Sequence, residues 1–270
     1  HVMTKNFSEF GGFEIWNGYR EYPSPELESH FIFARKGRLV SQYPYLYPIL
    51  CTPFYLIWGY RGLFFINAMA FIGIVSLCYA VAQKLFADRN LALNACLILI
   101  LATFSWEYSQ AAWPHATSLL FIMAAFYMFI CSFYGKTSRT ALLLALICGF
   151  ITGLGAGIRV DSIFVLPCFI IAFLFLQPHR PGLAFAVCIG SLPGLSILSA
   201  TNYSKFGVFS PFSYGRSDES SMGLLEIMRY LPFAGLTTVA VVVLWVVTRY
   251  PALNISLHRY KRPAIFIIIL

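Results

Sequence analysis

The segment with the clearest capacity for chemistry joins two long apolar stretches. Arg159 and Asp161 stand two residues apart in the glycine-rich segment 153–162. Ionisable groups at membrane depth are costly, so they usually line a polar cavity. A guanidinium stays charged and can bind oxygen atoms in a fork. The pair predicts either a substrate-binding site or a local ion pair that ends two helices.

A second polar segment, 106–115, also separates two apolar stretches. It carries Glu107 and His115, together with two tryptophans. A carboxylate and an imidazole can move protons or bind polar substrates. The alternative interpretation is that both side chains are simply solvated at the membrane surface.

The segment 201–216 has glycine, proline and serine at turn positions, with aromatic residues between them. Tyr203, Lys205 and Tyr214 lie in this segment. Such a composition suits contact with flat apolar or sugar-like surfaces. It is equally compatible with a lid packed on its own helices.

The N-terminal 42 residues are polar and include five glutamates, among them Glu9 and Glu14. Residues 30–41 alternate around a Lys-Gly turn, which predicts a small β-hairpin. The segment 43–59 holds three prolines and six aromatic residues. Proline removes a backbone donor, so an interfacial or re-entrant helix is expected rather than a straight span. An aromatic belt at the headgroup level is the alternative.

Composition sets the fold class. Hydrophobic residues make up 59% of the 270 positions and charged residues 11%, and the mean hydropathy is +0.73. We therefore expect an all-α, polytopic transmembrane helix bundle. Residues 1–62 form an outward-facing first loop with the hairpin and the interfacial helix, and residues 63–270 form the bundle. The predicted complete spans are 63–83, 91–106, 115–134, 140–158, 162–176, 182–201 and 231–248, and an eighth starts near residue 264.

Charge predicts the orientation of the bundle. The connections after alternate spans hold nine of the 19 lysines and arginines but only one acidic residue, Asp88. By the positive-inside rule these connections face the cytoplasm, and the segments holding Glu107 and Arg159 face outward. Cations scattered over short loops make no continuous face for nucleic acid. The seven cysteines lie in apolar stretches without metal-ligand spacing, so no metal is expected.

The ends of the chain carry a further expectation. A polar, outward-facing N-terminal segment normally follows an earlier span, and the chain ends inside an apolar run. We expect a fragment of a longer protein.

Taken in order, four segments resemble the membrane glycosyltransferases of the GT-C superfamily. The resemblance is strongest to bacterial relatives of the protein O-mannosyltransferase and aminoarabinose-transferase families, in the manner of glycosyltransferase family 39. The segments are 37–59, 108–115, 153–161, and 202–207 with Tyr214-Gly215.

The resemblance implies transfer of a sugar from a polyprenyl-phosphate donor, without another cofactor, to a glycan, lipid or protein acceptor outside the membrane. It also implies a location in the bacterial inner membrane. Arg159 matches a basic residue suspected of contacting the lipid phosphate, and Tyr203, Lys205 and Tyr214 would border donor or acceptor. The family's acidic residue follows its first span, whereas this chain has no aspartate before Asp88. Either that residue lies upstream of His1, or Glu9 or Glu14 replaces it, or it is absent.

Two other classes of function remain open. In a transporter or lipid flippase, Arg159 and Asp161 would line a substrate path, and internal repeats are typical. The proline-rich segment 43–59 has no second copy. In a membrane scaffold the outward carboxylates would be dispensable.

Overall fold

The computed structural model describes residues 2–11, 32–35 and 38–212. These residues form helices and one two-stranded sheet. In chain order the elements are α1 (Val2–Phe10), β1 (Ile32–Arg35), β2 (Arg38–Ser41), α2 (Leu46–Trp58), η3 (Gly59–Arg61), α3 (Gly62–Phe86), α4 (Arg89–Leu101), α5 (Ser105–Ser109), α6 (His115–Phe133), α7 (Ser138–Ile158), η4 (Val160–Phe164), α8 (Val165–Leu176) and α9 (Pro181–Phe206).

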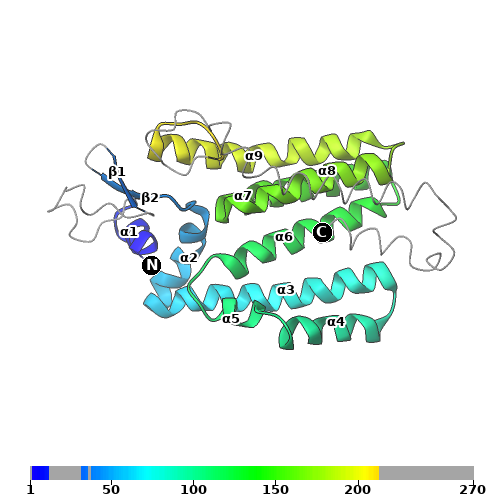
Figure 1. The fold of residues 1–270 in the computed structure, drawn as a ribbon, viewed down its shortest axis with the longest axis horizontal. Coiled ribbons are helices and arrows are strands. Elements are labelled where there is room, and N and C mark those ends of the chain that lie inside the picture. The colour runs from blue at the N-terminus through cyan, green and yellow to red at the C-terminus, as the bar shows by residue number, and fades with distance from the viewer. Residues whose placement is uncertain (1, 12–31, 36–37, 213–270) are drawn as a thin grey trace.

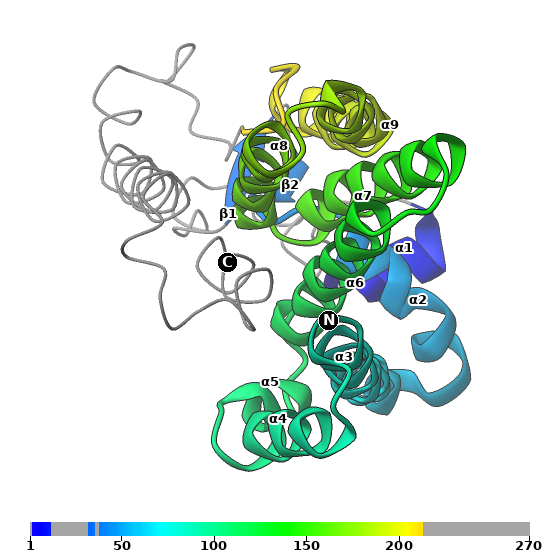
Figure 2. The same cartoon turned by 90° about the vertical axis from the view of Figure 1, so that its right-hand side faces the viewer.

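The long helices form a bundle with a common axis. Helices α3, α6, α7, α8 and α9 run along the length of the molecule, while α1, the hairpin and α2 gather at one end (Figure 1). Seen along the bundle, α9, α7, α6, α3 and α4 follow one another as a layer, and α8 packs beside α9 (Figure 2). The structure confirms the all-α bundle expected from composition.

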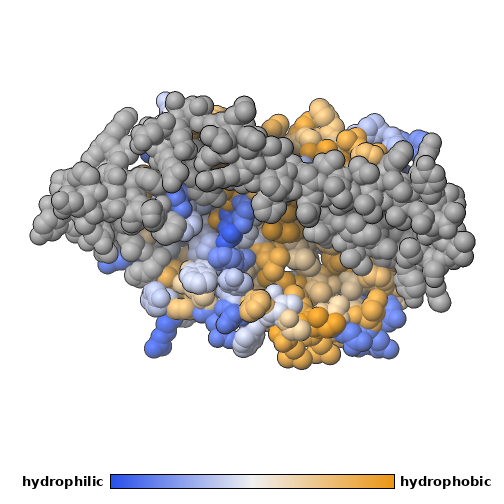
Figure 3. Space-filling model, in the orientation of Figure 1, coloured by the Kyte–Doolittle hydropathy of each residue, from blue (hydrophilic) through white to orange (hydrophobic). Residues whose placement is uncertain are grey.

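Apolar helix length agrees with most of the predicted spans. Four helical segments of the described part are long and apolar enough to cross a membrane: Leu46–Phe86, His115–Phe133, Ser138–Ile158 and Pro181–Phe206. Two shorter apolar helices occupy the predicted spans 91–106 and 162–176. The predicted spans from residue 231 onward lie outside the described residues. The visible surface is hydrophobic over the bundle and hydrophilic toward its two ends (Figure 3).

Helix α4 ends five residues before the predicted boundary at residue 106. The Thr103 hydroxyl donates to the Leu99 carbonyl at 2.6 Å and accepts from the Ser105 backbone N–H at 3.2 Å. Hydroxyl side chains that bond nearby backbone groups offer the chain an alternative to the helix. The chain consequently turns at 102–104 and enters the short helix α5.

Helix direction places the basic connections together. The connections α3–α4, α6–α7 and α8–α9 lie at the end of the bundle away from α1 and α2 (Figure 1). With the adjoining helix ends they hold five basic residues: Lys84, Arg89, Lys136, Arg139 and Arg180. The α3–α4 connection itself holds Asp88, whose carboxylate caps α4 by accepting two backbone N–H bonds at 2.9 and 3.1 Å. The starts of α3, α6 and α8 and the ends of α7 and α9 lie at the opposite end (Figure 1).

The segment 43–59 folds as a separate helix, α2, which lies across the end of the bundle (Figure 1). Gly59 ends it with a φ of +57°, a conformation that favours glycine. At Gly62 a Cβ atom would lie 2.1 Å from the Phe54 carbonyl oxygen, so only glycine allows α3 to start against α2. The expected hairpin is also present, with β1 and β2 antiparallel and Phe33 paired with Val40.

The tightest helix contact joins α7 to α9 through reciprocal glycines. Gly149 and Gly153 lie four residues apart on α7, and Gly190 and Gly194 do the same on α9. A Cβ on any of them would lie 2.0 to 2.4 Å from backbone atoms of the facing helix. Small residues spaced by four let helix backbones approach closely in membranes. The pair α7–α9 is therefore held at backbone contact.

We predict that Gly190→Ala destabilises the protein by about 1–3 kcal/mol, because its methyl group would overlap the Leu146 carbonyl. Gly182→Ala is the matched control on the same helix, since its Cβ would make an ordinary 3.7 Å contact with Leu142. Thermal unfolding of the purified protein in detergent checks this. Equal midpoints for the two variants would contradict the close packing.

Candidate functional site

Arg159 and Asp161 form an ion pair at the end of α7. Arg159 leaves the helix in an extended conformation, with φ −143° and ψ 125°, and Asp161 follows in η4. Arg159 Nε donates to both carboxylate oxygens at 3.0 and 3.2 Å, and Nη2 donates to Oδ2 at 2.6 Å. This two-pronged geometry is the strong form of an arginine–carboxylate pair. Their side chains are 31% and 54% exposed, so the pair is open to a ligand.

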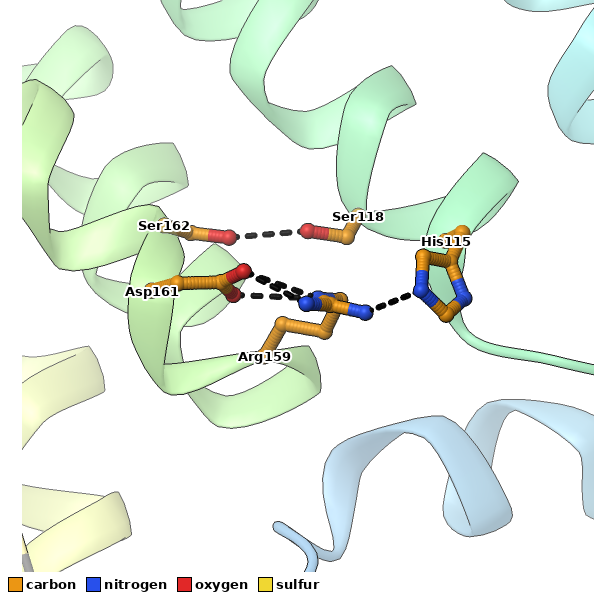
Figure 4. Close-up of polar contacts among 5 residues, drawn as sticks. All are labelled: His115, Ser118, Arg159, Asp161 and Ser162. Atoms are coloured by element: carbon orange, nitrogen blue, oxygen red, sulfur yellow. Dashed lines mark hydrogen bonds and ion pairs between the residues drawn. The ribbon is translucent and has the colours of Figure 1, made fainter. Parts of the chain in front are cut away.

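His115, the first residue of α6, completes the cluster. Arg159 Nη1 donates to His115 Nε2 at 2.5 Å (Figure 4). Because a guanidinium only donates, Nε2 accepts and the ring proton of the neutral histidine lies on Nδ1. That Nδ1 atom is buried and has no hydrogen-bond partner among the described residues. The cluster thus carries one buried polar atom whose hydrogen bond is not made by the described residues.

A second polar contact ties the same two elements together. The Ser118 and Ser162 hydroxyl oxygens lie 2.8 Å apart, one from α6 and one from η4 (Figure 4). Both serines are buried. Helix α6 and the end of α7 are therefore joined by two parallel polar links.

The ion pair and His115 line two hollows. The larger is a cavity of about 620 Å³, within the range of roughly 300–1,000 Å³ usual for small-molecule sites. The smaller has about 230 Å³. We call them the main cavity and the side cavity. The main cavity is lined by Met3, Thr4, Tyr43, Pro44, Tyr47, Pro48, Leu63, Ala112, Trp113, Pro114, His115, Ile158, Arg159, Val160 and Asp161. The side cavity is lined by His115, Ser118, Leu119, Ile122, Arg159, Asp161 and Ser162.

Asn67 holds several segments around the main cavity by hydrogen bonds. This asparagine on α3 is fully buried. Its Nδ2 lies 2.9 Å from the Tyr47 hydroxyl, 2.5 Å from the Ala111 carbonyl and 2.7 Å from the Trp113 carbonyl. Its Oδ1 accepts from the Thr117 hydroxyl at 2.8 Å. One amide therefore joins α2, α3, α6 and the loop before α6.

Aromatic rings flank the histidine. The Tyr108 ring stacks on His115 with centroids 4.6 Å apart and planes 14° apart, and Trp113 lies 5.7 Å from His115. Offset stacking of this kind restrains an imidazole ring. Glu107, in α5, is exposed and lines neither cavity.

The remaining predicted residues separate into three groups. Tyr203 is 61% exposed on α9, whereas Lys205 is buried near the end of that helix, and neither lines the two cavities. Glu9 lies in α1, the helix whose Met3 and Thr4 line the main cavity. Glu14 and Tyr214 lie outside the described residues. Within 2–11, 32–35 and 38–212, no three His, Cys, Asp or Glu side chains gather as a metal site would require.

Sequence reasoning missed the most connected residue of the site. Asn67 lies within the predicted span 63–83, near its outward end. A strongly polar side chain inside an apolar span is itself a signal of a function or a structural bond, because it needs partners there. Tyr47, Ser118 and Ser162 carried no comparable signal, since hydroxyl side chains are common at membrane edges.

The apolar helices and the polar cluster at one end of the bundle define an integral membrane protein with a ligand-sized site beside the bilayer. Residues 17–178, more than half of the chain, match the family described as dolichyl-phosphate-mannose-protein mannosyltransferase, and the chain belongs to this family of membrane glycosyltransferases. The match covers His115, Arg159 and Asp161. Comparisons with curated proteins and with solved structures returned no match.

We predict that Asn67→Leu lowers the stability by at least about 2 kcal/mol, because it leaves several buried acceptors without a donor. The control is Asn94→Leu, at an exposed position on α4. Thermal unfolding measures the stability, and tryptophan fluorescence reports the loop at Trp113. Wild-type stability of Asn67→Leu would show that the network contributes nothing.

Proposed function

We propose that this chain carries the donor-phosphate site of a glycosyltransferase that takes a sugar from a polyprenyl phosphate on the outward face of the membrane. One observation carries the proposal: Arg159, held by Asp161 and His115, forms a wall common to two cavities. Membership of the mannosyltransferase family supports the reaction class, with mannose as the first sugar to test.

The side cavity suits the lipid phosphate. Its polar lining consists of the ion pair, His115 and two serine hydroxyls, and its apolar lining is Leu119 and Ile122 on α6. A phosphate bound here would meet the guanidinium and hydroxyl donors, and the prenyl chain would leave along the apolar face of the helix. Arginine suits the task because its fork matches phosphate oxygens.

The main cavity suits the sugar and the acceptor. Its lining is rich in aromatic residues, including Tyr43, Tyr47 and Trp113, whose flat rings can contact sugar faces. The unsatisfied His115 Nδ1 offers a donor for a hydroxyl or phosphate oxygen. The acceptor on this side is a glycan, a lipid or a protein.

The reaction is a displacement at the anomeric carbon. An oxygen or nitrogen lone pair of the acceptor forms the new bond, while the bond to the phosphate oxygen breaks and its electrons remain on the phosphate. Arg159 stabilises that growing negative charge, and an outward carboxylate takes the acceptor proton. Among the described lining residues Asp161 is the one carboxylate, and Arg159 already binds it. Glu9 and Glu14 are the proposed bases.

Charge supports the outward location. His115 at the start of α6 and Arg159 just after α7 line both cavities. These helix ends lie at the opposite end of the bundle from the α3–α4, α6–α7 and α8–α9 connections (Figure 1). By the positive-inside rule the cavities face away from the cytoplasm. The proposed location is the bacterial inner membrane, with the site on its periplasmic side.

We predict that Arg159→Ala lowers sugar transfer about 10²- to 10³-fold, since it removes the charge that stabilises the leaving phosphate. Transfer is measured with radiolabelled polyprenyl-phosphate mannose and the intact protein in lipid vesicles. Arg61→Ala, at an exposed position on the same end of the bundle, serves as control. Unchanged transfer by a folded Arg159→Ala protein would refute the assignment, and transport without transfer would favour a transporter.

We predict that Asp161→Asn strengthens binding of polyprenyl phosphate about 2- to 5-fold, because a partly exposed carboxylate no longer competes for the guanidinium. Binding to the purified protein is followed by calorimetry. Asp88→Asn, at the opposite end of the bundle, controls for the loss of a negative charge. Weaker binding by Asp161→Asn would mean that the carboxylate orients Arg159 rather than competing with phosphate.

A further inference from the structure

Lys205 is a buried lysine that lines neither cavity. It lies in the last turn of α9 and is 3% exposed. Its Nζ donates to the Tyr43 backbone carbonyl at 2.6 Å, across 162 positions of sequence. The same Nζ lies 3.8 Å from the centre of the Tyr45 ring.

The partners of this amine are unusual for a buried lysine. In the part of the chain that the structure describes, no carboxylate pairs with it; it is bound by a carbonyl and by the ring face of Tyr45. Burial of an ammonium is costly unless hydrogen bonds and ring contacts replace the lost water. The carbonyl and the ring take the place of water around the amine, and both contacts fix where the side chain of Lys205 lies.

The residue that Lys205 binds belongs to the main cavity. Tyr43 and Pro44 line that cavity directly. Further along the same wall, the Tyr47 hydroxyl is bound by Asn67. The wall formed by 43–47 is thus anchored at both ends, by α9 at one and by α3 at the other.

Helix α9 also packs on the helix that leads to Arg159. Its glycines hold it at backbone contact with α7, and Arg159 directly follows α7. A displacement of the Lys205 contact would therefore change the separation between the 43–47 wall and the guanidinium.

The neighbouring polar residue has a parallel role. Asn202, one turn earlier on α9, is buried and donates to the Ser210 carbonyl at 2.8 Å. Gly207, which lies between Asn202 and Ser210 in the sequence, ends the helix with a φ of +72°. The last turn of α9 thus directs the Asn202 side chain to the segment that follows the helix and the Lys205 side chain to the cavity wall.

We infer that Lys205 is a positioning residue, which sets the Tyr43–Pro44 wall of the main cavity relative to Arg159 and does not itself bind the donor phosphate. The functional part of this inference rests on the proposed glycosyltransferase activity. The tether between Lys205 and Tyr43 can be tested without it.

The test compares Lys205→Met with Lys205→Arg in the full chain. Methionine keeps the length of the side chain and loses the donor, whereas arginine keeps a donor and a cation that can stack on Tyr45. Lys84→Met, at an exposed position on the far end of α3, is the control. Each variant is also made with Tyr43→Cys, and the labelling rate at position 43 by a membrane-impermeant maleimide is measured by mass spectrometry.

We expect Lys205→Met to label several-fold faster at position 43 and to transfer mannose about 10-fold more slowly, because small misplacements of a site wall are costly. Polyprenyl phosphate should bind Lys205→Met as tightly as it binds the wild type. Lys205→Arg should return the labelling rate at position 43 to the slower rate seen with Lys205, and it should return transfer to the wild-type rate. A labelling rate equal to that of the Tyr43→Cys protein with Lys205 intact overturns the inference. So does loss of polyprenyl-phosphate binding, which would make Lys205 a phosphate ligand.

The outcomes separate this inference from the proposed function. If Lys205→Met cannot be purified folded, Lys205→Arg is compared with the protein that keeps Lys205, both carrying Tyr43→Cys. Faster labelling of the Lys205→Arg protein at position 43 would then overturn the tether. If the wild type transfers no sugar, the proposed function fails, while faster labelling of Lys205→Met with restoration by arginine still supports the tether.

Discussion

The backbone contact between α7 and α9 is the constraint on which the site depends. Four glycines let the backbones of these two helices touch where any Cβ would meet the facing chain. Inside a bilayer the hydrophobic effect does not drive helices to associate, so close packing and polar contacts must stabilise the helix pair. The same helix end is packed on other faces as well, since Gly157 contacts Leu46 of α2 and Gly155 lies near Phe121 of α6. Successive glycines therefore bring three helices around the last turn of α7.

This crowding determines how the charges are held. Arg159 leaves α7 where the helix meets its neighbours, and its guanidinium is bound on one side by Asp161 and on the other by His115. An unpaired cation beside a bilayer would be costly. The ion pair lowers that cost, and its carboxylate stays 54% exposed. In the proposed function the same guanidinium also binds the donor phosphate.

Much of the architecture followed from local patterns. Long apolar runs predicted the helices, alternation around a turn predicted the hairpin, and prolines with Gly59 separated α2 from α3. These patterns work because a helix in lipid must satisfy its own backbone and be long enough to cross. The early end of α4 was missed, since it depends on the Thr103 hydroxyl competing for backbone groups.

By itself the sequence determined the class of the protein, because that depends on composition, and it offered an ion pair between Arg159 and Asp161 as one of two interpretations of their spacing. Only the tertiary structure decided which distant residues meet. It joined His115 to the Arg159 guanidinium, Asn67 to the Tyr47 hydroxyl and Lys205 to the Tyr43 carbonyl by hydrogen bonds. Those contacts cross 20 to 162 positions of sequence, so no pattern among neighbouring residues predicts them.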